Sequence, residues 1–247
     1  MRRMVVLLLL AALALRPASA QQSMTPHWTF AVTPYFWAAG IDGDVASFGL
    51  PVISVDASFS DIFDALDFGM MAAAEARYDV YSFFGDFMYT KISGAKGTPR
   101  GVVAQRVEVG SEMFAGLLGG GYSLWKGTSG HIDFAAGLRL WSVDNDIAIT
   151  GGVLDGRSES DGATWMDGVG GFRGTYGSYK AFLTGWALVG AGGAELEWDL
   201  ALAPGFRFSD TFSVALGYRV LGIDYEHDGF VLDVREHGPI LGVGIRF

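Results

Sequence analysis

Apolar and polar residues alternate along most of the chain. Between Glu195 and Phe208 the even-numbered positions are apolar, whereas the odd-numbered positions carry acidic, basic or small residues. The segments 131–140 and 212–220 repeat this pattern. Because successive side chains of a β-strand point to opposite faces, the pattern predicts strands with one apolar face and one small or charged face.

The spacing of these segments indicates a barrel. Alternating segments of about ten residues, separated by turn residues, are typical of transmembrane β-barrels. The connections are alternately short, as at 79–81 and 126–130, and long, as at 40–67, 95–110 and 144–161. We therefore expect an all-β fold, a closed antiparallel transmembrane β-barrel of about ten strands (8–12), with short periplasmic turns and longer external loops. The expected strands are 28–40, 67–78, 82–94, 111–125, 131–143, 162–174, 179–190, 195–208, 212–225 and 231–247.

Two further segments alternate inside the long connections. These are Leu50–Ser58 and Val102–Val109. We interpret them as strand extensions within the first two external loops. If both crossed the membrane, the barrel would have about twelve strands, which is still within the range of known barrels.

A soluble β-sandwich or small soluble barrel would also alternate, with its apolar residues facing inward. Two features favour the membrane. The non-apolar faces are rich in glycine and alanine, which suit a narrow lumen better than a wet surface. Large aromatics also lie at the ends of apolar faces, as in the interfacial girdles of membrane barrels: Trp198, Phe206, Phe208 and Tyr218.

Composition narrows the function classes. The chain of 247 residues has 14% aromatic residues, 36 glycines, no cysteine and a formal net charge of −10. The aromatic content excludes a disordered chain. The negative charge excludes nucleic-acid binding through bulk positive charge. The lack of cysteine excludes disulfides, thiol catalysis and Cys-ligated zinc.

The N-terminal segment is typical of a secretory signal peptide. Arg2 and Arg3 precede an apolar run, Met4–Leu15, and a small-residue cleavage site, Ala18–Ala20. We expect residues 1–20 to direct export and residues 21–247 to form one barrel domain in the cell outer membrane.

The C-terminal segment has an outward apolar face that ends in an aromatic residue. This face consists of Leu241, Val243, Ile245 and Phe247. It resembles the β-signal that the barrel-assembly machinery of Gram-negative bacteria recognises. We expect that machinery, outer-membrane lipid and lipopolysaccharide to be the partners, with no nucleic acid; the oligomeric state stays open.

Several short motifs resemble those of a known group. They are Thr33–Gly40, Phe59–Phe68, Gly217–Arg219 before Asp224–Tyr225, and Gly238–Gly242. Together they are similar to a group of uncharacterised proteobacterial outer-membrane β-barrel proteins, loosely related to small porins. The resemblance covers nearly all of residues 28–247 and implies a barrel, not a substrate.

If the apolar faces meet lipid, the opposite faces line a lumen. The predicted lumen-lining charged residues are Glu75, Arg77, Asp86, Asp133, Arg139, Asp167, Arg173, Glu195, Glu197, Asp199, Arg207, Arg219 and Arg246. Such a nearly balanced set favours arginine–carboxylate pairs that fill a narrow interior. The alternative is a narrow pore with a weak preference for cations, since the acids outnumber the arginines by one.

Candidate chemistry outside the lumen is sparse. His227 and His237 lie near Glu226, Asp228 and Glu236, where an imidazole could be oriented by a carboxylate, although a solvated acidic loop explains the same residues. Loop carboxylates could bind a hard cation, but their spacing matches no EF-hand. These acids are Asp42, Asp44, Asp144, Asp146, Asp155, Glu159 and Asp161.

The segment 60–68 has the spacing of a short amphipathic helical turn, with Ser60 or Asp61 as its N-cap. It would lie against the rim of the barrel or fold into its mouth, and we favour the rim.

We therefore expect a non-enzymatic outer-membrane barrel with a structural or interactive role, and narrow-pore passage of small solutes as its specific form. We expect no catalytic residues, cofactor or metal. The alternatives are an outer-membrane lipid-modifying enzyme and a soluble periplasmic ligand-binding barrel.

Overall fold

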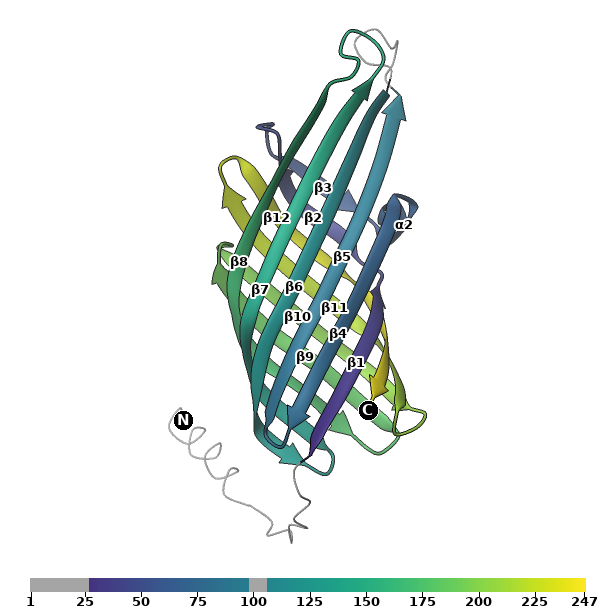
Figure 1. The fold of residues 1–247 in the computed structure, drawn as a ribbon, viewed down its shortest axis with the longest axis vertical. Coiled ribbons are helices and arrows are strands. Elements are labelled where there is room, and N and C mark those ends of the chain that lie inside the picture. Colours follow the sequence, from purple (N-terminus) through teal and green to yellow (C-terminus); the bar gives the residue numbers. More distant parts are fainter. Residues whose placement is uncertain (1–26, 98–105) are drawn as a thin grey trace, which may run out of the picture.

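The computed structural model describes residues 27–97 and 106–247, so the predicted signal peptide lies outside the described residues. Ten antiparallel strands close into a barrel (Figure 1). In barrel order they are β1 (Trp28–Trp37), β4 (Leu66–Tyr78), β5 (Tyr81–Gly97), β6 (Arg106–Gly127), β7 (Gly130–Thr150), β8 (Ser158–Gly177), β9 (Ala181–Gly192), β10 (Leu196–Arg207), β11 (Phe212–His227) and β12 (Phe230–Arg246). In the described part of the chain, no helix is both long and apolar enough to cross a membrane.

The first external connection holds two short strands and a helix. They are β2 (Gly40–Ala46), β3 (Ile53–Ala57) and α2 (Phe59–Asp64). The β1–β4 ladder ends at the Pro34–Ala72 pair, and β2 then continues β1 along β12. The segment Leu50–Ser58 thus contributes β3 and does not cross the membrane. Of Val102–Val109, only 106–109 is described, and it belongs to β6.

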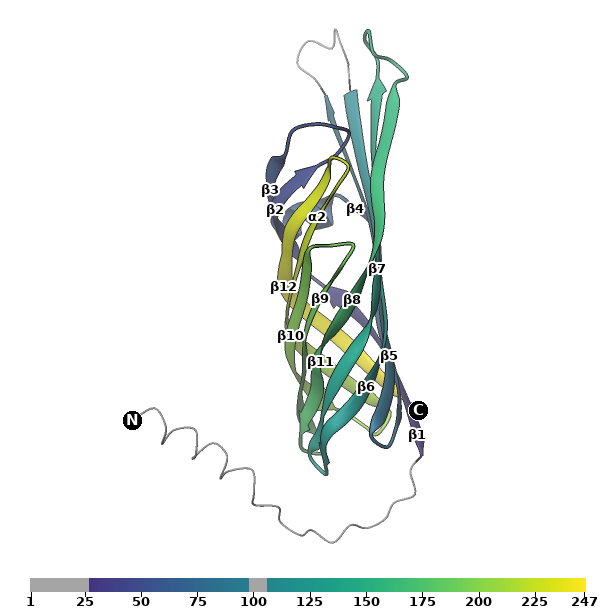
Figure 2. The ribbon, with the colours of Figure 1, turned by 90° about the vertical axis from the view of Figure 1, so that its left-hand side faces the viewer.

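The second and third external connections are much shorter than predicted. Strands β5 to β8 run far beyond the rest of the barrel (Figure 2). Of the two predicted connections 95–110 and 144–161, the described residues 95–97, 106–110, 144–150 and 158–161 belong to these strands. Their pairing stays in register, as in Val107–Ile149 and Val109–Ile147. The prediction was wrong because acidic residues alternate with the β-branched residues here, and such a mixed segment resembles a loop. A strand that lies outside lipid can carry polar residues on a face that meets water.

Tight turns close the hairpins. Asp228 and Gly229 form a two-residue turn between β11 and β12, with φ angles of 49° and 84°. Positive φ at both positions is the type I′ geometry that matches the twist of the flanking strands. The short turns after β4, β6, β8 and β10 lie at the same end as Trp28 and Phe247, which the alternation of connections assigns to the periplasm.

The inside and outside faces agree with the predicted alternation. On β10, Leu200 and Leu202 expose 46% and 57% of their surface on the outer face, whereas Ala201 and Ala203 are buried in the lumen. Of the aromatics at the ends of the outer faces, Phe206, Phe208 and Tyr218 are exposed and Trp198 is partly buried. Phe247 stacks on Phe30 at 6.1 Å between ring centroids. This is the distribution of a barrel whose outer face meets lipid.

Helix α2 begins earlier than predicted. Its N-cap is Ser58, because the Ser58 side chain accepts a hydrogen bond from the Asp61 backbone N–H and Asp61 in turn accepts from the Ser58 backbone. Hydrogen bonds from the Ser58 hydroxyl and backbone lower the pKa of Asp61. Phe59 packs edge-to-face on the outward-facing Phe36, so the helix lies at the rim and not in the mouth.

Candidate functional site

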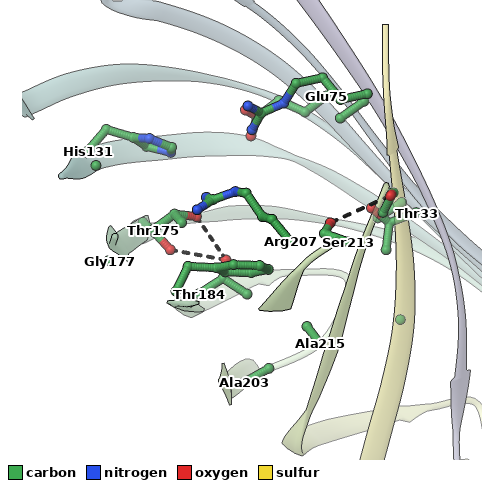
Figure 3. Close-up of a pocket in the computed structure, with 18 of the residues that line it drawn as sticks. Thr33, Glu75, His131, Thr175, Gly177, Thr184, Ala203, Arg207, Ser213 and Ala215 are labelled. Atoms are coloured by element: carbon green, nitrogen blue, oxygen red, sulfur yellow. Dashed lines mark hydrogen bonds between the residues drawn. The ribbon is translucent and has the colours of Figure 1, made fainter. Parts of the chain in front are cut away.

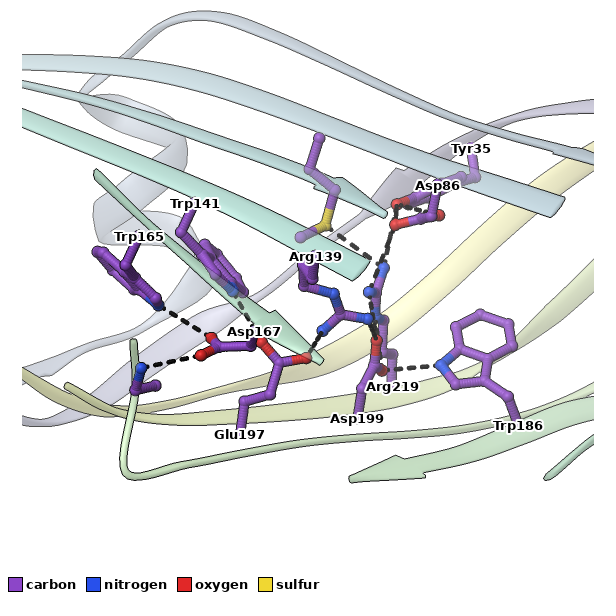
Figure 4. Close-up of polar contacts among 12 residues, drawn as sticks. Tyr35, Asp86, Arg139, Trp141, Trp165, Asp167, Trp186, Glu197, Asp199 and Arg219 are labelled. Carbon is purple, nitrogen blue, oxygen red and sulfur yellow. Dashed lines mark hydrogen bonds and ion pairs between the residues drawn. The ribbon is translucent and has the colours of Figure 1, made fainter. Parts of the chain in front are cut away.

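A layer of paired charges crosses the lumen. Arg139, Glu197, Asp199 and Arg219 each expose 2% or less of their side chain. Arg219 Nη2 and Nε donate to the two carboxylate oxygens of Asp199 at 2.7 and 3.1 Å, and Arg139 Nη2 donates to Asp199 at 2.8 Å (Figure 4). Arg139 Nη1 lies 3.1 Å from Glu197 Oε1. We call these four residues the closure layer.

Side chains from the neighbouring strand β9 and from the facing strands β1 and β5 add hydrogen bonds to the closure layer. Trp186 Nε1 donates to Asp199 at 2.8 Å. Arg219 Nη1 donates to the hydroxyl of Tyr35 at 3.0 Å, and that hydroxyl donates to Asp86 at 3.0 Å. The layer therefore connects β10 and β11 to β1 and β5 across the barrel, and planar arginine forks suit such bidentate contacts.

A second buried carboxyl lies beside the layer. Asp167 accepts hydrogen bonds from Trp165 Nε1 at 3.0 Å and from the Ala194 backbone N–H at 2.9 Å. Glu197 likewise accepts from Trp141 Nε1 at 2.9 Å. Each carboxyl is thus held by an indole N–H, which is a donor that brings its own apolar bulk into the lumen.

An apolar cluster fills the lumen on the external side of the closure layer. Trp165 stacks between Trp141 and Tyr225, with centroid distances of 5.9 and 3.9 Å. The buried members of the cluster are Trp37, Met88, Ala115, Trp141, Val143, Trp165, Ala194, Leu221, Ile223, Tyr225, Phe230, Leu232, Val234 and Ile240. Charge pairs and packed aromatics therefore close the barrel together.

On the periplasmic side, a second ionic cluster lies along one wall. Arg77 pairs with Asp133 and with Glu75, the latter at 3.1 Å. Ser123 Oγ donates to Asp133 at 2.6 Å, and Arg173 Nη2 lies 3.3 Å from Glu75. This cluster follows the wall and does not cross the lumen.

A cavity of about 640 Å³ occupies the periplasmic part of the lumen (Figure 3). The turn segments 126–131, 177–179 and 209–213 surround its mouth, and Tyr35 and Trp186 contribute to its inner end. Its volume is that of a small-molecule site.

Most of the predicted lumen residues do point inward. Glu195 differs, because it lies in the exposed turn before β10 and is not buried among the others. Inside the barrel or at the cavity lie Glu75, Arg77, Asp86, Asp133, Arg139, Asp167, Arg173, Glu197, Asp199, Arg207, Arg219 and Arg246.

The four residues of the predicted β-signal lie on the last strand. Leu241, Val243 and Phe247 are exposed on its outer face, and Ile245 is partly buried. Their recognition by the barrel-assembly machinery stays a prediction.

The prediction omitted the lumen tryptophans. Trp141 lies two residues after Arg139, and Trp165 lies two residues before Asp167, so each shares the inward face of its strand with a charged residue. Strand parity alone would have placed both inside. Their contacts with Glu197 and Asp167 needed the structure.

The histidine cluster is not assembled. His237 faces outward, with Nδ1 2.8 Å from the Tyr218 hydroxyl and Nε2 3.4 Å from Asp42. Glu236 follows the opposite parity on β12 and points inward, while His227 is exposed in the turn region. His227 Nε2 lies 3.3 Å from Asp228, so each histidine has a carboxylate neighbour, but no hydrogen bond or ion pair among the described residues joins the two histidines to each other or to Glu236.

The predicted loop acids mostly lie on strands. Asp42 on β2 pairs with Arg235 at 2.8 Å. Asp161 on β8 accepts hydrogen bonds from the Phe48 backbone N–H and the Ser47 hydroxyl, which lower its pKa. These bonds tie the tip of the β2–β3 hairpin to the opposite wall outside the membrane.

No protein-family model matches the chain, and no curated protein matches it in sequence. Among solved structures, it is similar to the outer membrane protease OmpT from Escherichia coli, with a TM-score of 0.57 and 10% identity over 92% of this chain and 99% of that chain. It is also similar to the translocator domain of the autotransporter NalP from Neisseria meningitidis, with a TM-score of 0.50 and 16% identity over 100% of this chain and 98% of that domain. At these identities the similarity establishes the fold alone.

The closed ten-stranded barrel is thus the fold of outer-membrane β-barrel proteins. The resemblance to proteobacterial outer-membrane barrels is confirmed at the level of the fold. The similarity to small porins stays a prediction.

Proposed function

We propose that this protein is a non-enzymatic outer-membrane barrel with a closed lumen and a structural or interactive role. Its outer face would contact outer-membrane lipid and lipopolysaccharide. Small solutes would pass only when the closure layer opens transiently.

One observation carries this proposal, namely the closure layer itself. Charges taken out of water are tolerated when each is paired and hydrogen-bonded, and Asp199 has two arginines and an indole N–H as partners. A water-filled pore would leave these groups solvated, yet they are almost fully buried. Barrels of this size hold side chains in their interior, in contrast to the open channels of 16–18 strands.

The interactive role would reside on strands β5 to β8, which project beyond the rest of the barrel (Figure 2). The exposed ion pair Arg106–Glu108 lies on this projection, and the exposed pair Lys91–Glu112 lies at its base, where Lys91 is paired with Phe68 of β4. The projection would present a paired β-sheet to the cell exterior.

Conductance in planar bilayers tests the closed lumen. We expect the unmodified protein to be electrically silent. The double substitution Glu197→Gln with Asp199→Asn replaces two buried carboxylates at nearly constant shape. It leaves Arg139 without a carboxylate partner and Arg219 with Asp86 alone, at 3.5 Å. A buried charge without its partner is costly, so this variant should show frequent openings.

A matched control removes two exposed acids, Asp42→Asn with Asp44→Asn, and should stay silent. Steady conductance of the unmodified protein, or equal openings in both double variants, would contradict closure by the layer.

A further inference from the structure

Charge is distributed unevenly along the lumen. At the closure layer and beside it, two arginines face five carboxylates, namely Asp86, Asp167, Glu197, Asp199 and the inward-pointing Glu236. The cavity shows the opposite balance, because five basic side chains line it against three acids, Glu75, Asp86 and Asp210. The five bases are Arg77, Lys126, Arg173, Arg207 and Arg246. The numbers of acidic and basic residues are nearly equal over the whole lumen, but basic residues are in excess at its periplasmic end.

Two of these cations have no acidic partner among the described residues. Arg207 donates from Nη1 to the Ser178 carbonyl at 2.8 Å, and Arg246 makes no ion pair in the described part of the chain. Both arginines line the same cavity. A cleft lined by charges of one sign attracts ions of the opposite sign, so this end of the cavity favours anions.

Arg207 is held in place by stacking. Its guanidinium lies 4.4 Å from the centre of the Phe182 ring, and the ring in turn lies over Gly205. A Cβ on Gly205 would come within 2.2 Å of the ring, so glycine is needed for this arrangement.

Arg173, farther inside, is built in the same way. Its guanidinium lies 4.0 Å from the centre of the Phe84 ring, which lies over Gly119. Its Nη2 pairs with Glu75, but Nη1 is shielded from solvent and has no hydrogen-bond partner among the described residues. A buried donor without a partner is costly and points to an acceptor that a ligand would supply.

Neutral polar groups and small residues complete the cavity. Thr33, Thr184 and Ser213 place hydroxyl groups on its wall, and Ala203 and Ala215 leave space between them (Figure 3). The Thr184 and Ser213 hydroxyls donate to backbone carbonyls, so the guanidinium groups are the charged donors that this cavity offers to one small solute.

We propose that this cavity is a binding site for a small phosphate-bearing solute that enters from the periplasm. An arginine guanidinium can bind two phosphate oxygens at once. A phosphate monoester would supply the negative charge that Arg207 and Arg246 have no partner for, together with further hydrogen-bond acceptors. The site lies on the periplasmic side of the closure layer, so its occupancy does not require passage across the membrane.

Titration calorimetry of the folded full-length protein in an uncharged detergent tests this proposal. The probes are inorganic pyrophosphate, glucose 6-phosphate, glucose as the neutral match, and citrate as a carboxylate anion. We expect saturable binding of both phosphates that weakens with salt, and none of glucose. Citrate should bind more weakly than the phosphates.

Variants locate the site. Arg207→Gln with Arg246→Gln should weaken phosphate binding by about tenfold or more, since it removes charged hydrogen bonds. Gly205→Ala should weaken it without any change in charge, by displacing Phe182 and Arg207. The control, Arg106→Gln with Arg235→Gln, removes two exposed external arginines and should leave affinity unchanged.

Absence of phosphate binding, or equal weakening in the control, would overturn the proposal. Tighter binding of citrate would overturn the assignment to phosphate. Because binding is measured in detergent, the result is independent of whether the lumen conducts in bilayers. Heat-modifiable gel mobility confirms folding, and the single variant Arg246→Gln, at the exposed end of β12, replaces the double variant if that one does not fold.

Discussion

Replacement of Arg219 by methionine is expected to lower the free energy of unfolding by about 3–5 kcal/mol, because it removes the cation of a buried ion pair and leaves the carboxylate of Asp199 buried. Arg219 is the bidentate partner of Asp199 and also donates to the Tyr35 hydroxyl. Methionine retains apolar bulk but leaves Asp199 with Arg139 as its remaining cation. Urea-induced unfolding from lipid vesicles measures the loss.

The control for this prediction is Arg235→Met. Arg235 pairs with Asp42 on the exposed outer rim, so its loss should cost no more than about 1 kcal/mol. Equal losses for the two variants would show that the closure layer is no more tightly coupled than a surface pair.

Substitution of Leu200 by arginine is expected to cost about 2–4 kcal/mol if Leu200 meets lipid near the bilayer midplane. Leu200 lies in the middle of β10 with its side chain on the outer face. The matched change is Ala203→Arg on the same strand, which points into the cavity and should show no lipid-depth penalty. Folding into bilayers of increasing thickness measures both variants.

The reverse ranking, with Leu200→Arg silent and Ala203→Arg severe, would exchange the inner and outer faces. The soluble ligand-binding barrel would then be the better account.

Alternation in the sequence was sufficient to assign faces. The parity of β10 placed Leu200 outside and Ala201 inside, and the structure confirms both positions. Strand boundaries were less certain where charged residues occur in strands beyond the membrane, as at Asp144 and Asp146 on β7. There the lipid no longer requires an apolar face, and the signal for a strand weakens.

The contacts inside the lumen could not be predicted. Asp199 meets Arg139 across 60 residues, and Arg219 meets Tyr35 across 184 residues. The stagger between strands decides which inward residues lie at the same height in the barrel and can touch. Alternation with a period of two residues carries no information about this stagger. For the same reason, the near balance of acids and bases did not reveal the basic periplasmic cavity.

The central claim is that the lumen is closed between the cavity and the cell exterior, and thiol labelling tests it most directly. The chain has no cysteine, so single cysteines can be introduced at Ala203 in the cavity, at Thr128 in a periplasmic turn and at Glu159 on the external end of β8. A small membrane-impermeant thiol reagent is added outside proteoliposomes. The labelled fraction of Thr128→Cys gives the share of molecules whose periplasmic end faces outward, and that of Glu159→Cys gives the share in the opposite orientation. Closure predicts that Ala203→Cys is labelled to the same fraction as Thr128→Cys. Labelling of Ala203→Cys in both orientations would show an open lumen and contradict the account.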